Sequence, residues 1–264
     1  MPVRTLVSAV GRRTIDGVTE FGYACALCAE SVFWLIAGTF LHQRVRAASV
    51  FRDAMAIGVR AIPIAALLCF AVGVMLAIQG IDTLKPYGAQ NKVVLGIALS
   101  VTREFAPLII GILVAGRSGS AITARLGTMV QAQEVDALRV IGINPVRYIA
   151  TPLLLAMLLM VPALTVIGEF MALFGGAVYT ALELHMPPGV YVDLAFSIID
   201  ANDITQGLVK STIFAIIIVL IGLINGFQVR GGAEDVGRAT TRSVVLAISF
   251  IVLADMVFTY LLNH

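Results

Sequence analysis

Charge is what this chain of 264 residues lacks most: 13% of its residues are Asp, Glu, Lys or Arg, whereas 59% are hydrophobic. Soluble domains carry about 25% charged residues. A chain of this composition has too few polar groups to cover a globular surface in water. It is therefore predicted to be an integral membrane protein.

The motifs of enzymes and metal sites are also missing. There is no GxxxxGK[ST] phosphate loop, no HExxH and no GxSxG, and the three histidines, His42, His185 and His264, are isolated in the sequence. No basic–aromatic pattern indicates a nucleic-acid partner. We therefore expect no catalytic residue, no metal site and no cofactor bound by this chain.

Cysteine is scarce as well, since only Cys25, Cys28 and Cys69 occur. The first two form a CxxC pair, which is compatible with redox or metal chemistry. No second pair accompanies it, so the cysteines are interpreted as small apolar side chains on helices.

What the chain does have is a series of long apolar segments. A spanning helix needs about 20 apolar residues, because the hydrocarbon core is about 30 Å thick. Residues 18–58 are interpreted instead as helices in or near the membrane interface, since Glu30 interrupts the apolar stretch 21–41. The prediction is an all-α polytopic membrane protein with an N-terminal cytoplasmic or interfacial amphipathic region, 1–60, and a five-helix transmembrane domain, 61–264. The five expected spans are 61–81, 93–116, 148–182, 207–228 and 243–262.

Basic residues predict the orientation. Fourteen lie in the three regions 1–60, 117–147 and 229–242, against two, Lys85 and Lys92, in the connections on the other side. Because basic loops stay in the cytoplasm, we expect a cytoplasmic N-terminus and an outer C-terminus. No signal peptide is evident. The outer segment 183–206 is acidic and is expected to be a solvated loop.

Several ionisable residues lie inside the expected spans. Arg103 and Glu104 are midway along the second, Lys210 is in the fourth and Asp255 in the fifth, with Glu169 in the third. A charge in the bilayer costs a few kcal/mol on the most lenient scale, so it faces a cavity or a partner. They form either a polar site for a substrate headgroup or salt bridges that only fix helix packing.

Two short sequence patterns predict contacts, one between helices and one with a partner surface. Gly222 and Gly226 form a GxxxG motif, which favours close helix packing and a dimer. Between the second and third spans, a helix is predicted over about 131–141, ended by Gly142. Val135, Leu138 and Ile141 are spaced three apart and give it an apolar edge. A helix this short is marginal alone and needs a partner surface.

Linked motifs resemble those of one family. TREFAPLIIGILVAGRSGSAITARLGTM (102–129), QEVDALRVIGINPVRYIATP (133–152), LINGF (223–227) and GRATTRSVV (237–245) are similar to the MlaE (YrbE) permeases of lipid-transporting ABC systems, along nearly the whole chain. The resemblance implies a homodimeric permease in a bacterial inner membrane. It would move phospholipids, or related hydrophobic lipids, between inner and outer membranes and so maintain outer-membrane lipid asymmetry.

The resemblance also implies partners. A cytoplasmic ATPase subunit would bind ATP and Mg, and a periplasmic Mce-domain protein would carry lipid. A small accessory subunit is allowed. The outer loop is unlike the family in detail, which leaves open which carrier docks there.

Site residues follow from the same resemblance. The lipid cavity would be lined by Arg103, Glu104, Lys210 and Asp255, and by Leu76, Thr83, Leu84 and Tyr87 at the end of the first span. The polar stretch 117–147 would be a coupling loop that contacts the ATPase through Glu134, Asp136, Leu138 and Arg139.

Two other functions stay open on the residues alone. A proton-coupled secondary transporter would use Glu104 or Asp255 as its proton site and need no ATPase. A structural membrane anchor of an envelope complex would assemble without moving lipid.

Overall fold

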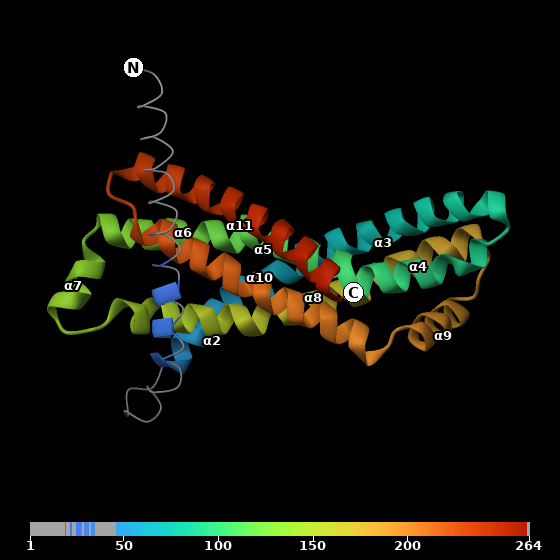
Figure 1. The fold of residues 1–264 in the computed structure, drawn as a ribbon, viewed down its shortest axis with the longest axis horizontal. Helices are drawn as coiled ribbons and strands as arrows, with labels where there is room; N and C mark the ends of the chain where they lie inside the picture. The colour runs from blue at the N-terminus through green and yellow to red at the C-terminus, as the bar shows by residue number, and fades with distance from the viewer. Residues whose placement is uncertain are drawn as a thin grey trace, which may run out of the picture.

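The computed structural model describes residues 46–262 and, before them, residues 19, 22, 25–27, 29–31, 33 and 34. The predicted interfacial region 1–60 therefore lies mostly outside the described residues. Figure 1 shows the long helices of the described part running along the long axis of the molecule.

Within the described part, all regular elements are helical, and five helices are long and apolar enough to cross a membrane. The predictions of an all-α fold and of five spans are confirmed. By length and composition the five candidates are Ala47–Tyr87, Val93–Gln131, Val146–Glu183, Ala201–Phe227 and Ala233–Leu261.

The first candidate consists of two helices. A short 3₁₀ turn, η1 (Val59–Ala61), joins α2 (Ala47–Ile57) to α3 (Ile62–Leu84). Two further turns, η2 (Lys85–Tyr87) and η3 (Gln90–Lys92), lead the chain into the second span.

The second span is longer than predicted. Helical structure continues from Val93 to Gln131, whereas the sequence pattern predicted an end at residue 116. Residues 117–131 stay helical because Ile122, Leu126 and Gly127 are buried against the rest of the protein. The segments in order are α4 (Val93–Ser100), η4 (Val101–Phe105), α5 (Ala106–Val114), η5 (Ala115–Gly119) and α6 (Ser120–Gln131).

The third span begins with a π-helical turn, η6 (Val146–Ala150), and continues as the 33-residue helix α8 (Thr151–Glu183) with Pro162 inside it. At 1.5 Å per residue α8 alone is about 50 Å long, more than the hydrocarbon core requires. It therefore extends beyond the core or lies tilted in it.

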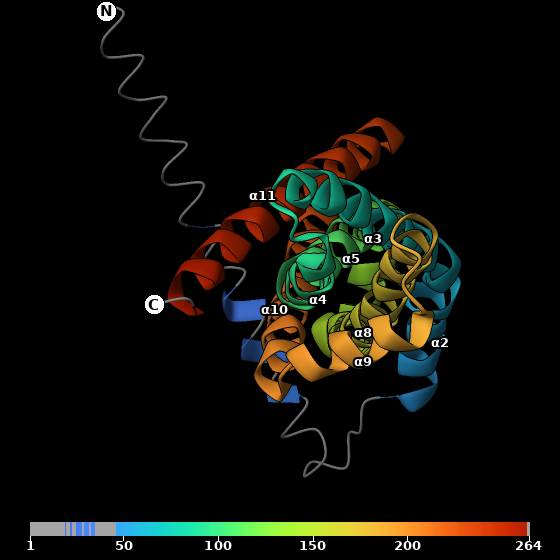
Figure 2. The same ribbon diagram turned by 90° about the vertical axis from the view of Figure 1, so that its right-hand side faces the viewer.

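The segment between the third and fourth spans, predicted to be a solvated loop on the outer side, is not simply a loop. It contains the apolar helix α9 (Pro188–Ile198), which lies across one end of the bundle in Figure 2. Tyr191 is 1% exposed and anchors α9 against Gly176 of α8, where a Cβ would lie 2.6 Å from the tyrosine oxygen. Burial also raises the pKa of the Tyr191 hydroxyl.

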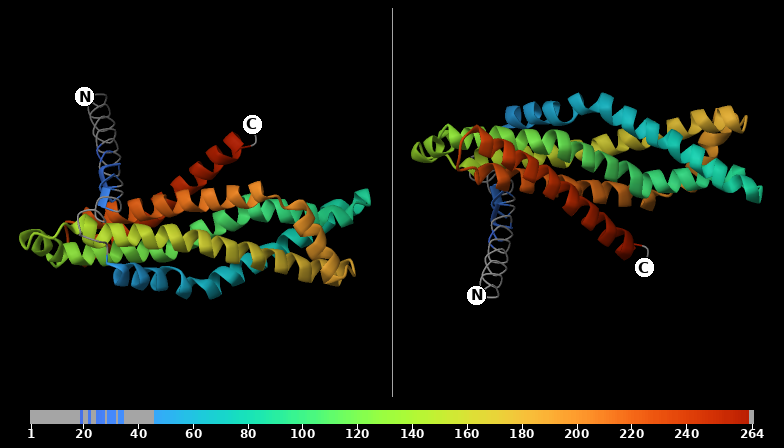
Figure 3. Two further views of the ribbon diagram at one scale, coloured as in Figure 1. Left: turned by 90° about the horizontal axis from the view of Figure 1, so that it is seen from below. Right: turned by 90° about the horizontal axis from the view of Figure 1, so that it is seen from above.

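The last two spans are α10 (Ala201–Phe227) and α11 (Ala233–Leu262). In the most apolar stretch of α10, 56% of the residues are buried, against 11% in α11. Both views in Figure 3 show the C-terminal half of α11 leaving the bundle. α10 is thus a central helix, and α11 has a large uncovered apolar surface.

Small residues allow the close contacts in the bundle. The buried face of α3 repeats every four residues through Ala65, Cys69, Gly73, Ala77 and Ile81. A Cβ on Gly73 would collide with the backbone of Ala172 in α8, so the two backbones touch at this point.

The GxxxG motif makes its contacts within the chain. A Cβ on Gly226 would lie 2.8 Å from Leu126 Cβ, and Gly222 adjoins Ile122. The motif therefore packs α10 on α6.

Candidate functional site

Lys210 is the centre of a buried cluster of charged side chains. Its side chain is 1% exposed, and its Nζ donates to Glu104 Oε2 at 2.5 Å. Nζ also donates to Thr259 Oγ1 at 3.0 Å and lies 3.1 Å from Asp255 Oδ1, an ion-pair distance without hydrogen-bond geometry. The cluster joins the second, fourth and fifth spans.

The local sequence accounts for the positions of the three partners of Lys210. Pro107 has no N–H to return to the carbonyl four residues earlier, and directly before it the chain widens into the π-helical turn η4, which carries Glu104. On α11, Asp255 and Thr259 are four residues apart and so lie on one face. Thr259 Oγ1 also lies 3.1 Å from each oxygen of Glu104.

Arg103 faces a different partner on α10. Its Nη2 and Nε both lie 2.7 Å from Asp203 Oδ1. The second oxygen of Asp203 accepts from the backbone N–H of Asp200, which completes the capping box at the start of α10. Arg103 and Glu104 are therefore both ion-paired to α10, at residues about two turns apart.

The four side chains of these ion pairs differ in their solvent exposure. Arg103 and Glu104 remain 39% and 33% exposed, whereas Lys210 and Asp203 are almost completely buried. The buried partners fix the geometry, and the partly exposed pair retains surface for contact with a ligand.

The apolar residues predicted for the lipid site lie elsewhere. Leu76, Thr83 and Leu84 line a cavity of about 300 Å³ between α3 and α4, which Gln79 and Ser100 also line. Tyr87 lies in η2, is 80% exposed and does not line this cavity. No residue of the Lys210 cluster lines it either, so the predicted site is divided between two places.

Glu169 of α8 is a second buried acid, outside the Lys210 cluster. It is 6% exposed, and its Oε1 has no hydrogen-bond partner among the residues that the structure describes. Thr102, Phe170 and Phe196 line a small cavity of about 50 Å³ with it.

Sequence reasoning missed Asp203 and Thr259. Both had a local signal: Asp203 is the third residue after the cap Asp200, and Thr259 is one helical turn beyond Asp255. Neither signal by itself identifies the partner across the bundle.

The predicted coupling residues lie on a short helix at one end of the molecule. α7 (Glu134–Val140) starts three residues later than predicted, because α6 runs to Gln131 and Gln133 turns the chain with a φ of 59°. Gly142, with a φ of 78°, ends the segment as predicted. Asp136 and Arg139 pair at 3.1 Å.

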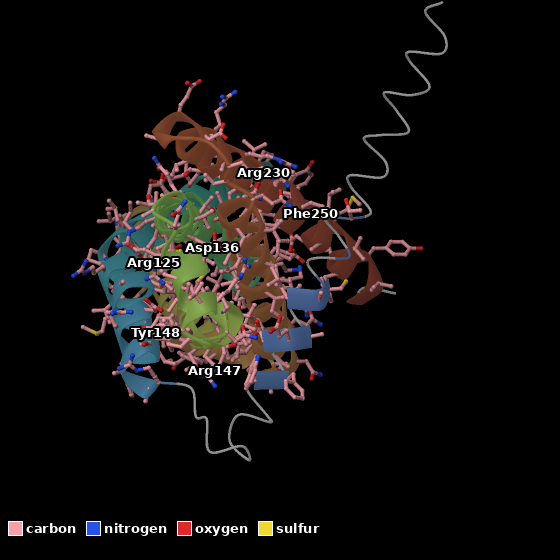
Figure 4. The ribbon with its side chains drawn as sticks, turned by 90° about the vertical axis from the view of Figure 1, so that its left-hand side faces the viewer. Arg125, Asp136, Arg147, Tyr148, Arg230 and Phe250 are labelled. Carbon is pink, nitrogen blue, oxygen red and sulfur yellow. The ribbon has the colours of Figure 1, made fainter. Side chains whose placement is uncertain are left out.

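Figure 4 views the molecule from this end and labels Asp136. Of the predicted apolar edge, Val135 is buried and Leu138 packs on the core, whereas Ile141 is exposed. Val140 and Ile141 are 86% and 67% exposed. The free surface of the helix is thus made of charged residues followed by two apolar ones.

No group of three or more His, Cys, Asp or Glu side chains among the described residues could hold a metal ion. Five apolar helices, ion pairs buried between three of them and an exposed short helix at one end define a polytopic membrane transport protein. Residues 50–261 match the family model of the permease MlaE. The chain belongs to the MlaE permease family.

Similar proteins occur in bacteria and in a plant. A probable ABC transporter permease protein of Rickettsia typhi is 30% identical over 257 residues, which cover 97% of each chain. The intermembrane phospholipid transport system permease protein MlaE of Haemophilus influenzae is 26% identical over 96% of this chain and 95% of its own. The chloroplastic protein trigalactosyldiacylglycerol 1 of Arabidopsis thaliana is 34% identical over 71% of this chain and 54% of its own.

Proposed function

We propose that this chain is the transmembrane permease subunit of an ABC transporter that moves phospholipids, or related hydrophobic lipids, between the inner and outer membranes of a bacterium. The match to the MlaE family over residues 50–261 carries the proposal. The name of the Haemophilus relative, which is similar along nearly the whole chain, supports the lipid substrate. Such transport maintains the lipid asymmetry of the outer membrane.

The energy comes from a separate subunit. Because this chain has no phosphate loop, a cytoplasmic ATPase binds ATP together with Mg and hydrolyses the ATP. α7 is the element that the ATPase pushes. Helical structure is continuous from Glu104 to Gln131, one turn before α7, so a movement of α7 is transmitted along a rigid element to the Lys210 cluster.

The assembly is a homodimer in the bacterial inner membrane, with the N-terminus in the cytoplasm and the C-terminus in the periplasm. The uncovered apolar surface of α11, which includes Phe250, Met256 and Tyr260, supports a second protomer packing there. A periplasmic Mce-domain carrier docks at the end opposite α7, and a small accessory subunit completes the complex.

Within the dimer, lipid headgroups contact Arg103. Its guanidinium is held in place by buried Asp203 yet stays 39% exposed, which suits a residue that binds an anionic group. Glu104 is oriented by Lys210 and Thr259, and Asp255 completes the cluster beside Lys210. The apolar wall for acyl chains includes Leu76 and Leu84, and Thr83 and Tyr87 contact the lipid from the same end of the first span.

One experiment distinguishes this function from the alternatives. The chain is purified in mild detergent from cells that express its neighbouring genes, and bound proteins, ATPase activity, bound lipid and lipid transfer between vesicles are measured. An ABC permease retains an ATPase and phospholipid. Transport without any ATPase would indicate a proton-coupled transporter, and a stable complex that moves no lipid would indicate a structural anchor.

The headgroup role of Arg103 is tested with its own partner as the control. Arg103→Gln should lower ATP-dependent lipid transfer roughly tenfold, because a charge-assisted hydrogen bond to the headgroup is lost. Asp203→Asn breaks the same ion pair but keeps the guanidinium, and should lower transfer much less. Equal losses in the two variants would assign Arg103 to helix packing alone.

The coupling role of α7 is tested by changing its exposed charges. The triple variant Glu134→Ala, Asp136→Ala, Arg139→Ala should still bind lipid but lose the ATPase during purification. The matched control is Glu234→Ala with Arg238→Ala, which removes an exposed ion pair at the start of α11. ATPase retention by the α7 variant at the level of this control would contradict the assignment.

A further inference from the structure

A second charged site lies at the α7 end of the bundle, away from the Lys210 cluster. It is a pocket of about 370 Å³ between α2 and the second span. Three arginines line it, Arg60 in η1, Arg117 in η5 and Arg125 in α6, together with one acid, Asp53. Figure 4 labels Arg125 on the side of the molecule where α2 lies.

The charges in this pocket do not balance. Asp53 is buried and accepts from Arg125 Nη1 at 3.0 Å, which accounts for one arginine. Arg117 donates to the backbone carbonyls of Ala56 and Ile57 at 3.4 Å, neutral groups at the end of α2. Three guanidinium groups against one carboxylate leave an excess of two positive charges.

Arg60 is free to bind a ligand. It forms no hydrogen bond or ion pair with any residue in the described part of the chain, and it is exposed at the pocket. A guanidinium presents several donors in a fork that matches the oxygens of a phosphate group. Arg60 and Arg117 line the same pocket, and neither is paired with a carboxylate there.

The surroundings select a lipid phosphate over a soluble one. Ile57, Ile122 and Leu153 also line the pocket, so its walls are apolar below the arginines. On the outer face of α2 and η1, Phe51, Met55 and Val59 are exposed, which places α2 in contact with the membrane. A ligand at this position can put its phosphate on the arginines and its acyl chains along apolar surface.

We propose that this pocket binds an anionic phospholipid of the membrane leaflet at the α7 end as a resident ligand, distinct from the lipid that is transported. The phosphate bridges Arg60 at the start of the first span to Arg117 on the second span. The bound lipid thereby holds α2 against the helix that leads to α7. This inference concerns binding only and does not depend on transport activity.

The test is native mass spectrometry of the purified full-length chain with phosphatidylglycerol or phosphatidylcholine added. The wild-type chain should bind phosphatidylglycerol preferentially. Arg60→Ala should lower its affinity about fivefold, the factor that corresponds to about 1 kcal/mol for an arginine near an anionic lipid. Phosphatidylglycerol should also raise the melting temperature of the wild-type chain more than that of Arg60→Ala.

The matched control is Arg52→Ala, which removes an exposed arginine of α2 that does not line the pocket. It should leave the preference for phosphatidylglycerol nearly unchanged. Equal losses in Arg52→Ala and Arg60→Ala, or equal binding of phosphatidylcholine, would overturn the proposal. Displacement of the lipid by an equal concentration of inorganic phosphate would overturn its assignment as a lipid site.

Discussion

Lys210 and Glu169 are both ionisable side chains buried in the membrane-spanning bundle, but their surroundings are opposite. Lys210 has three oxygen-bearing partners on two other spans. Glu169 Oε1 has no hydrogen-bond partner in the described residues and adjoins an aromatic cavity. A buried charge is costly unless it is paired. The position of an acid or base within a span therefore does not by itself show whether the residue is ion-paired.

The difference follows from the helices that each residue faces. Lys210 on α10 points to Glu104 on η4 and to α11, where Asp255 and Thr259 lie one turn apart. Glu169 on α8 lies beside Gly207, where α10 approaches so closely that a Cβ would meet the backbone oxygen of Thr102. Small residues bring α10 near Glu169 without offering a side chain to pair with it.

The largest expected effect is that of breaking the paired cluster. Lys210→Met leaves Glu104 and Asp255 facing each other without a cation, which should destabilise the protein by about 3–5 kcal/mol. Thermal unfolding of the purified chain in detergent measures this loss. The control replaces the whole cluster with Glu104→Gln, Lys210→Met and Asp255→Asn together, and should recover most of the stability. A single variant that melts like the wild type would show that the cluster is not an essential ion pair.

A smaller effect is expected from the hydroxyl in the cluster. Thr259→Val keeps the shape of the side chain but removes its hydrogen bonds, and should cost about 1 kcal/mol. The same change at Thr241, an exposed residue of α11 that bonds only to the backbone of its own helix, should have almost no effect. Matching melting temperatures for Thr259→Val and Thr241→Val would remove Thr259 from the cluster.

The smallest effect is expected at Glu169. The same change from Glu to Gln is made at Glu169 and at Glu104, so that an unpaired acid is compared with a paired one. Glu169→Gln should leave the melting temperature unchanged or raise it, since no ion pair is lost. Glu104→Gln should lower it, because Lys210 loses its shortest contact. If Glu169→Gln destabilises the protein as much as Glu104→Gln, then Glu169 has an ionic partner outside the described residues.

Parts of this architecture were predictable from sequence because they depend on single segments. Spans such as α3 and α10 are long apolar runs that only a helix can carry through a bilayer. Arg103 and Lys210 were noticeable because charge is rare in such runs. The ends of helices were less predictable: residues 117–131 and α9 look polar or mixed locally, and their helical structure depends on neighbours that bury one face.

Helical structure and five apolar segments long enough to cross a membrane can be predicted from the amino-acid sequence, because the hydrocarbon core leaves few alternatives to an apolar helix. The residues that are costly in that environment can be predicted in the same way. That Glu104, Lys210 and Asp255 meet while Arg103 pairs with Asp203, and that Arg60 and Arg117 line one pocket, is visible only in the folded structure. Such pairings depend on which helix faces come into contact, and that depends on small residues distributed over the whole chain.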